Sequence, residues 1–195
     1  MLTFIPALSA VTTGWERIAG TGSLSWWFAG PLIAASLHVC EEFVYPGGFR
    51  SWYGSYRPEI ASSLSARYLL VVNAIMLAVC ALVAIAGPST NGTANWFVIT
   101  SILFWNAIFH IRAVFRMGRY SPGVITGAFL YIPLAVLGSV NLLQRRLVPW
   151  GVAAGCFGIG SLYHVFSLRN HRRRVRQQSV GDKRSIAESA ERPVK

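Results

Sequence analysis

The stretch SLHVCEEFVYPGGF, residues 36–49, carries the groups of this sequence that are best suited to chemistry. His38, Glu41 and Glu42 are spaced by three and four residues, which places them on one face of a helix. Imidazoles and carboxylates bind transition metals and also act as general acids and bases. These three residues end one of the most apolar runs of the chain, where a bilayer penalises each of them, so their presence indicates a functional site.

Two later apolar runs carry further groups of the same kinds. Asn106 and His110 share a helix face, and His164 lies near the end of the last run. We expect one or two divalent transition-metal ions, either zinc or iron or manganese. The expected ligands are histidines and carboxylates: His38, Glu41, Glu42, His110 and His164. The expected catalytic groups act as a base or hold water or a substrate oxygen: Glu41, Glu42 and Asn106.

Five stretches of about 20 mostly apolar residues must position these groups, and each is long enough to cross a bilayer as a helix. They are residues 24–45, 66–87, 95–116, 122–143 and 149–168. The composition agrees, because 53% of the residues are hydrophobic and only 13% are charged, about half the share usual in soluble domains. The predicted fold is all-α, an integral membrane bundle of five transmembrane helices.

The charge distribution divides the chain into three parts. Residues 1–23 lack the basic start of a signal peptide and are expected to lie at the membrane interface. Residues 24–168 form the membrane domain, and residues 169–195 a basic, mobile cytoplasmic tail. The net charge of +11 owes much to this tail, which follows directly after the last apolar run. Such a cluster is typical of topology control and contact with anionic lipids, so we expect no nucleic-acid partner.

The arginine-rich segments also predict how the bundle is oriented. A basic C-terminal tail favours a cytoplasmic C-terminus, and five crossings then place the N-terminus outside. The first, third and fifth spans consequently run in the same direction. Their histidines are therefore expected at the same depth in the membrane, near the cytoplasmic leaflet. This shared depth is the main indication of a common site. His171, in the tail, is expected to face water.

The segments between the spans suggest a lipid-like or other apolar substrate. The stretch YPGGFRSWYGSYRP, residues 45–58, interleaves aromatic residues with arginines, a combination suited to the headgroup region. In RYSPGVIT, residues 119–126, Ser121 is expected to cap a helix that begins with Pro122. The candidate substrate contacts are polar residues on this side of the membrane: Arg50, Arg57, Ser121 and Tyr163.

The segments HVCEE, YPGGFRSWY, NAIFH, YSPGVITG and YH, in this order, resemble the family of bacterial membrane proteins named for its HXXEE motif. The similarity runs from about residue 25 to residue 168. It implies a multispanning protein of the cell inner membrane with enzymatic activity, and it supplies no substrate. By resemblance, the characteristic positions of the family fall on residues of the first and third spans: His38, Glu41, Glu42, Asn106 and His110.

The sequence therefore predicts a membrane enzyme with a His/Glu metal centre that acts on a lipid-like substrate. Two alternatives stay open. In the first, no metal is present, and Glu41 and Glu42 are the acid and base of an isomerase or cyclase of isoprenoid-type substrates. In the second, the same groups form the relay of an ion or metal transporter, although the outer halves of the spans offer few polar residues to continue a path. The sequence carries no signal for an oligomeric state.

Overall fold

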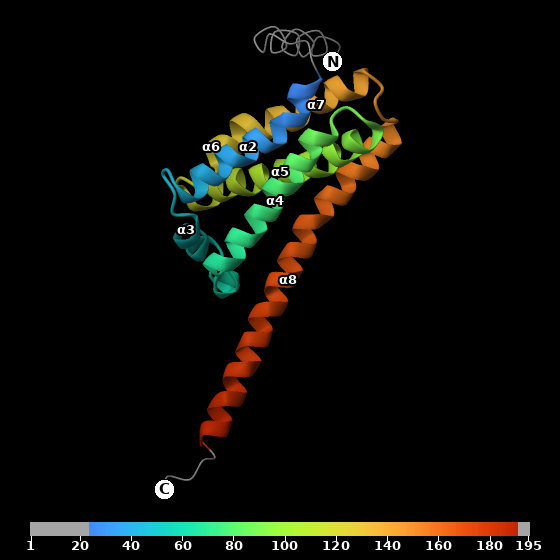
Figure 1. The fold of residues 1–195 in the computed structure, drawn as a ribbon. Coiled ribbons are helices and arrows are strands. Elements are labelled where there is room, and N and C mark those ends of the chain that lie inside the picture. Colours follow the sequence, from blue (N-terminus) through green and yellow to red (C-terminus); the bar gives the residue numbers. More distant parts are fainter. Residues whose placement is uncertain (1–23, 191–195) are drawn as a thin grey trace.

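The computed structural model describes residues 24–190, and for Ser63 and residues 178–190 it describes the backbone alone. The interfacial segment expected at residues 1–23 lies outside the described residues, as do residues 191–195. Every regular element between residues 24 and 190 is helical (Figure 1). In chain order these elements are α2 (Ser25–Phe43), α3 (Phe49–Tyr56), the 3-10 helix η1 (Pro58–Ser63), α4 (Ala66–Ala86), α5 (Thr90–Met117), α6 (Val124–Thr126), the π-helix η2 (Gly127–Tyr131), α7 (Ile132–Gln144) and α8 (Trp150–Ala190).

Four stretches of helix in the described chain are long and apolar enough to cross a membrane. They are Ala66–Ala86, Thr90–Met117, Val124–Gln144 and Trp150–Gln177, and they match the second to fifth apolar runs of the sequence. Helix α2 matches the first run but is not among the four. It has 19 residues and includes both glutamates of the HXXEE motif, which lower its apolar character. The all-helical, membrane-type fold is thus confirmed, with four candidate spans.

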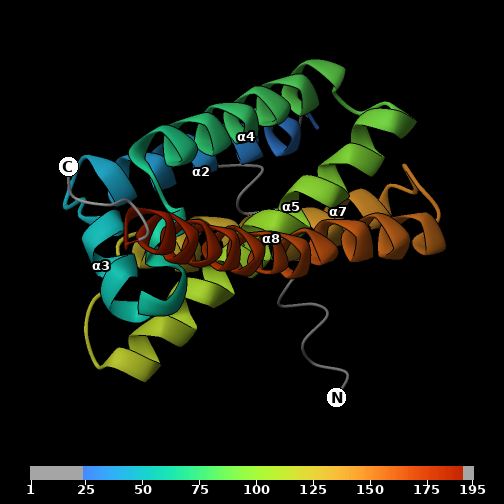
Figure 2. The same ribbon diagram turned by 90° about the horizontal axis from the view of Figure 1, so that it is seen from below.

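Helix α5 lies at the centre of the bundle, where it contacts α2, α4, η2, α7 and α8. Its start is fixed by Ser89, whose hydroxyl accepts a hydrogen bond from the backbone N–H of Gly92. Its end is fixed by Gly118, which has a φ of +62° and adopts the left-handed conformation that closes many helices. Figure 2 shows α2 beside α4, and α8 lying across α5.

The core at the end of the bundle farthest from α3 is built around Trp96 of α5. Its indole N–H donates a 2.7 Å hydrogen bond to the backbone carbonyl of Trp27 in α2. On its other side α7 approaches closely, because a side chain at Gly138 would place its Cβ 2.5 Å from the Trp96 ring. A buried tryptophan whose N–H is hydrogen-bonded contributes a large buried apolar area and also a directional contact between helices. Helices α2, α5 and α7 are thereby fixed relative to one another.

The chain between α5 and α7 takes an irregular path. Gly123 has a φ of +99° and precedes α6, which begins at Val124, so the expected helix start at Ser121 and Pro122 is wrong. A π-helical turn follows, in which the N–H of Ile132 donates to the carbonyl of Gly127. Pro133 lies directly after this turn and has no N–H for an α-helical bond, which favours the irregular geometry. The path turns the 121–131 segment toward α2 and α5.

Helix α8 continues past residue 168, where the tail was expected to start, and runs to Ala190. Figure 1 shows it projecting well beyond the bundle on the side where α3 lies. The expectation that His171 faces water is wrong, because α8 passes the start of α4 at this point. His171 is buried, and its Nε2 lies 3.3 Å from the hydroxyl of Tyr68. Arg174, one turn further along, lies 4.8 Å from the centre of the Tyr68 ring.

Candidate metal centre

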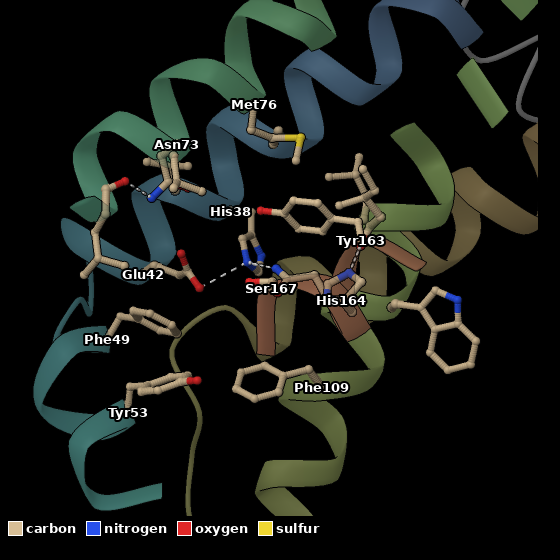
Figure 3. Close-up of a pocket in the computed structure, with 18 of the residues that line it drawn as sticks. His38, Glu42, Phe49, Tyr53, Asn73, Met76, Phe109, Tyr163, His164 and Ser167 are labelled. Atoms are coloured by element: carbon tan, nitrogen blue, oxygen red, sulfur yellow. Dashed lines mark hydrogen bonds and ion pairs between the residues drawn. The ribbon is translucent and has the colours of Figure 1, made fainter. Parts of the chain in front are cut away.

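Three buried side chains converge where α2 and α5 meet. His38 and Glu42 lie one turn apart on α2, and His110 comes from α5. Oε1 of Glu42 is 3.4 Å from Nε2 of His38 and 3.2 Å from Nε2 of His110. One donor atom from each residue lies within 4.8 Å of the other two. Figure 3 shows the Glu42 carboxylate facing the His38 ring. The structure therefore brings together one carboxylate and two imidazoles of the expected ligand set.

The His38 ring is oriented by a chain of two hydrogen bonds. The Thr126 hydroxyl donates to Oε2 of Glu41, and since it has a single hydrogen it accepts from Nδ1 of His38 at 2.8 Å. Nδ1 thus carries the proton, and the lone pair of the neutral ring is on Nε2, which faces Glu42. Glu41 thus fixes the tautomer of His38 through the Thr126 hydroxyl. In known metal sites, carboxylates and carbonyls that bond to the second ring nitrogen of a histidine ligand have the same effect.

The His110 ring is held in a similar way. Its Nδ1 is 2.9 Å from the hydroxyl of Ser121, and the ring is completely buried. The indole of Trp52 stacks on it at 5.8 Å between ring centres. Nε2 has no hydrogen-bond partner among the described residues, although Oε1 of Glu42 is only 3.2 Å away. The ring nitrogen is therefore close to the carboxylate without being aimed at it.

These distances fit a shared metal ion. Zinc binds histidine nitrogen and carboxylate oxygen at about 2.0–2.2 Å, so ligand atoms in a tetrahedral site lie roughly 3.3–3.6 Å apart. The observed separations of 3.4 and 3.2 Å are close to that range. Wherever both Nε2 atoms carry lone pairs, they repel the ionised carboxylate, and a cation among the three groups offsets that repulsion. The three donors are of types that bind transition metals and lie within 4.8 Å of one another, so the cluster is a candidate metal site.

Gly123 closes the cluster from the side of the 121–126 segment. A Cβ atom at this position would lie 2.6 Å from Cε1 of His38 and 2.9 Å from Cε1 of His110. The backbone therefore rests against both imidazole rings, and its positive φ also favours glycine. No larger residue fits, so the SPG segment supplies a backbone wall for the two histidines.

Asn106 adds an amide to the same group of atoms. Its Nδ2 is 2.9 Å from Nε2 of His38, to which it donates. A half-turn of the amide exchanges its donor for an acceptor oxygen. Asn106 is thus able either to bond to the unligated imidazole or to direct an oxygen toward an ion held by the cluster.

Glu41, expected to be a ligand, lies outside the cluster and holds the neighbouring loop instead. Its carboxylate accepts hydrogen bonds from the Tyr120 hydroxyl at 2.6 Å and from the backbone N–H groups of Ile125 at 3.0 Å and Thr126 at 2.7 Å. Burial and the bond to Glu41 raise the pKa of the Tyr120 hydroxyl, which stays a donor. Glu41 therefore fixes the segment from which Gly123 and Thr126 reach the imidazoles.

His164, the fifth expected ligand, is not brought into the cluster. Its Nε2 lies 2.9 Å from the backbone carbonyl of Ile102, to which it donates. A histidine bonded in this way is a satisfied polar group between two packed helices. His164 nevertheless lines the cavity that adjoins the cluster.

That cavity has a volume of about 400 Å³ and is bounded by residues of α2, α3, α4, α5 and α8. His38 and Glu42 form part of its wall, and Tyr53 and Phe109 lie close to them (Figure 3). Most of the lining is aromatic or aliphatic. Burial raises the pKa of Tyr53 to about 12, so its hydroxyl remains protonated and able to donate. A polar cluster on the wall of an apolar cavity is typical of ligand sites.

The expected substrate contacts divide into two pairs. Arg57 and Tyr163 line the cavity. Arg50 is exposed in a separate shallow hollow beside Phe43, and Ser121 is buried behind His110. Sequence reasoning assigned no individual role to Gly123, Thr126 or Tyr131, whose ring lies 4.6 Å from that of His38. The only signal for the first two was their place in the YSPGVITG segment.

Comparisons with known proteins relate this chain to one family. A family model described as a protein of unknown function with HXXEE motif matches residues 26–138. The uncharacterized protein YrkK of Bacillus subtilis (strain 168) is 26% identical over 121 residues, which cover 60% of this chain and 75% of YrkK. No solved structure matches. The matched residues include the entire cluster and the loop that supports it but not His164 in α8. Because the family model covers more than half of the sequence, this chain belongs to the HXXEE family.

Proposed function

We propose that this protein is an integral membrane enzyme that uses a divalent metal ion, bound by His38, Glu42 and His110, to act on a lipid-like or other apolar substrate. The observation that supports this most is the convergence of two imidazole nitrogens on one carboxylate oxygen, at 3.4 and 3.2 Å, beside a largely apolar cavity. The three protein donors leave one coordination position for water or substrate, as in catalytic zinc sites.

The residues around the cluster have separable tasks in this proposal. A bound ion would polarise a substrate oxygen or lower the pKa of a bound water. Thr126 and Ser121 keep the ring nitrogens turned toward the ion, and Glu41 keeps Thr126 in place. Asn106 orients water or a substrate oxygen, since its amide already lies against the cluster. Nitrogen and oxygen donors suit zinc and also iron or manganese. With Glu41 and His164 engaged elsewhere, the cluster supports a single ion.

We propose that the protein lies in the cell inner membrane and crosses it five times. The N-terminus is then outside and the C-terminus in the cytoplasm. Helix α2 counts as the fifth crossing because it packs alongside α4 and also contacts α5. The basic end of α8 projects on the side of α3 (Figure 1), so the arginines of both segments share one side. The positive charge bias supports a cytoplasmic location of that side and of the metal centre near it.

A second candidate is metal-free acid–base catalysis. The 3.2 Å separation of Glu42 Oε1 and His110 Nε2 is also short enough for a shared proton. In that case Glu42 and His110 exchange the proton with an isoprenoid-type substrate in the cavity. The presence of His38 as a third donor within 4.8 Å of the other two favours the metal. A transporter finds less support, because the described polar cluster lies at one end of the bundle.

Metal stoichiometry decides between these candidates. We expect the protein, purified in mild detergent without chelators, to contain about one zinc, iron or manganese ion per chain. His38→Ala, Glu42→Gln and His110→Ala should each lose most of it, because two donors do not complete the coordination. His164→Ala is the matched control, since it removes a histidine of the same cavity that is bonded to backbone. If wild type contains no metal and none of these ions raises its melting temperature, the metal centre is excluded and the acid–base candidate leads.

A further inference from the structure

We propose that the substrate is a single-chain amphiphile with an anionic head, bound with its head at Arg57 and Arg112 and its chain toward Met76 and Leu77. This inference rests on the proposed function and adds the substrate class and its orientation. It is carried by the way in which charged and apolar residues are distributed along the cavity beside the metal centre.

The cavity is long and its far end is apolar. Its α4 wall extends from Tyr68 to Leu77, nine residues or about 13 Å along the helix axis. Met76 and Leu77 on this wall pack against the same apolar cluster as Leu103 of α5, and all three line the cavity. Figure 3 shows Met76 at the opposite side of His38 from Phe49 and Tyr53. An extended hydrocarbon chain fits this shape better than a compact polar molecule does.

The volume suits one chain. A dry cavity of about 150 Å³ accommodates benzene, which has six carbon atoms, so about 400 Å³ accommodates a chain of roughly 16 carbon atoms. Two acyl chains of ordinary length exceed that number. The cavity therefore suits a fatty-acid-like or prenyl-like molecule rather than a two-chain phospholipid.

The other end of the cavity carries positive charge. Arg112 lines the cavity and has no hydrogen-bond or ion-pair partner among residues 24–177. Arg57 lines it as well, and its single acidic partner is the exposed Glu59 at 3.4 Å, a contact that contributes little. Tyr53 adds a protonated hydroxyl. Arg112 and Tyr53 are donors without an acceptor among residues 24–177, and Arg57 has only the exposed Glu59, so the three side chains select an anionic head.

The metal centre lies beside the head rather than the tail. Arg112 follows His110 by two residues, which is about 3 Å along α5. Leu103, at the apolar end, precedes His110 by seven residues, or about 10 Å. A molecule bound in this orientation presents the bond next to its head group to Glu42 and His38.

Access from the bilayer is available between α4 and α8. Among the described residues these two helices touch at Tyr68, which contacts His171 and Arg174, and they are not among the closely packed helix pairs of the bundle. Beyond that contact the cavity separates Asn73 and Met76 of α4 from Tyr163 of α8. An amphiphile in the same leaflet enters there without leaving the membrane.

The test is equilibrium binding of radiolabelled twelve-carbon amphiphiles to the full-length protein in phosphatidylcholine nanodiscs. Dodecanoate and dodecyl phosphate should each bind at least about 10-fold more tightly than dodecanol or dodecyltrimethylammonium. The ratio of the two anions identifies the head as carboxylate or phosphate. Equal binding of anion and cation, or equal competition by two-chain phosphatidylglycerol, would overturn the proposal.

Matched variants locate the bound molecule. Arg112→Gln and Arg57→Gln should each weaken dodecanoate binding about 10-fold, whereas Arg119→Gln, an exposed arginine outside the cavity, should not. Met76→Trp should abolish binding by filling the apolar end, while Leu82→Trp on the exposed side of α4 should leave it intact. Unchanged binding in Arg112→Gln or Met76→Trp contradicts the orientation.

Metal content measured on the same samples separates this inference from the proposed function. Wild type with metal but without preference for anions refutes the substrate class and leaves the metal centre standing. Wild type that binds dodecanoate without metal refutes the metal centre and retains the binding site. Retained metal in Arg112→Gln shows that lost binding does not come from a damaged cluster.

Discussion

The two imidazoles of the site are both held through Nδ1 by short hydroxyl side chains of one loop. Ser121 and Thr126 stand five residues apart, with Gly123 between them, and each contacts a different ring. The Thr126 hydroxyl accepts from Nδ1–H of His38, and the Ser121 hydroxyl is bonded to Nδ1 of His110, so in both rings it is Nε2 that faces Glu42. The loop therefore sets the chemistry of histidines that lie on other helices.

Thr126→Val tests this support at the scale of one atom. Valine keeps the shape but removes the acceptor for His38 and the donor to Glu41, so metal affinity should fall about 10–100-fold. Thr126→Ser should retain most of the affinity. Thr100→Val is the control, because it makes the same substitution at a buried threonine whose hydroxyl bonds within α5 to the carbonyl of Trp96. Competition with a calibrated chelator measures the affinity, and an unaffected Thr126→Val would show that the tautomer is set otherwise.

Gly123→Ala tests the backbone wall. Gly123 and Gly118 both have positive φ, +99° and +62°, so alanine at either costs about 1–2 kcal/mol of backbone strain. Only at Gly123 does the new Cβ meet the imidazoles, whereas nothing lies within 4 Å at Gly118. We therefore expect Gly123→Ala to lose the metal and Gly118→Ala to keep it. The backbone strain should lower the melting temperature of both variants by a similar amount. Equal metal content in both variants would contradict the proposed packing.

At this scale the sequence predicted which residues meet but not all of their roles. The i, i+4 spacing of His38 with Glu42, and of Asn106 with His110, placed each pair on one helix face. In the structure the two pairs meet each other, Asn106 against His38 and His110 against Glu42. Glu41 is one residue from Glu42, about 100° around the helix, and the loop that faces it is invisible in the local pattern. His164 contacts α5 at Ile102, eight residues or about 12 Å before His110, because its position within the last apolar run does not tell which level of a neighbouring helix it meets.

Helices are the elements that the sequence predicted best, because an apolar run of about 20 residues has few other structures in a membrane. The starts of α4 and α5 follow Ser65 and Ser89, which cap them as serine commonly does. The segment from Gly118 to Tyr131 was predicted poorly. Its left-handed glycine and π-turn arise from contacts with α2 and α5, which local sequence does not record.

Truncation of α8 gives a prediction at the scale of the element. Ending the chain after Gln177 should leave the metal content and melting temperature unchanged, because the contacts to Tyr68 remain. Ending it after Asn170 removes His171 and Arg174 and should lower the melting temperature by roughly 2–4 °C for each kcal/mol lost, with metal retained. Loss of metal in the shorter chain would mean that α8 contributes to the site. Thermal unfolding with metal analysis of both truncations provides the measurement.

At the scale of the whole molecule, the exposed apolar surface indicates the environment of the protein. Large side chains such as Leu70, Ile85, Ile159 and Phe166 are exposed on α4 and α8. In water a patch of this extent would drive association, whereas hydrocarbon solvates it. The two helices that flank the cavity thus present their outer faces to lipid.

Topology is the prediction that belongs to this scale. Reporter fusions at the two termini should give opposite signals, and a fusion in the α4–α5 loop at Ser89 should report the same side as the N-terminus. Equal signals at the termini would mean that α2 does not cross the membrane and that the count is four. A fusion at Gly118, next to the metal centre, should match the C-terminus in either case.

The reach of α8 has a mechanical consequence. From Ser161, which contacts Ser101 of α5, to Ala190 its backbone extends about 44 Å at ~1.5 Å per residue. Tilting the helix by about 10° at this contact displaces its far end by roughly 8 Å. Ser167, which forms part of the cavity wall, lies about 9 Å beyond the same contact. The cavity wall and the tip therefore move in the same direction, and a small displacement at Ser167 is accompanied by a displacement about five times larger outside the bundle.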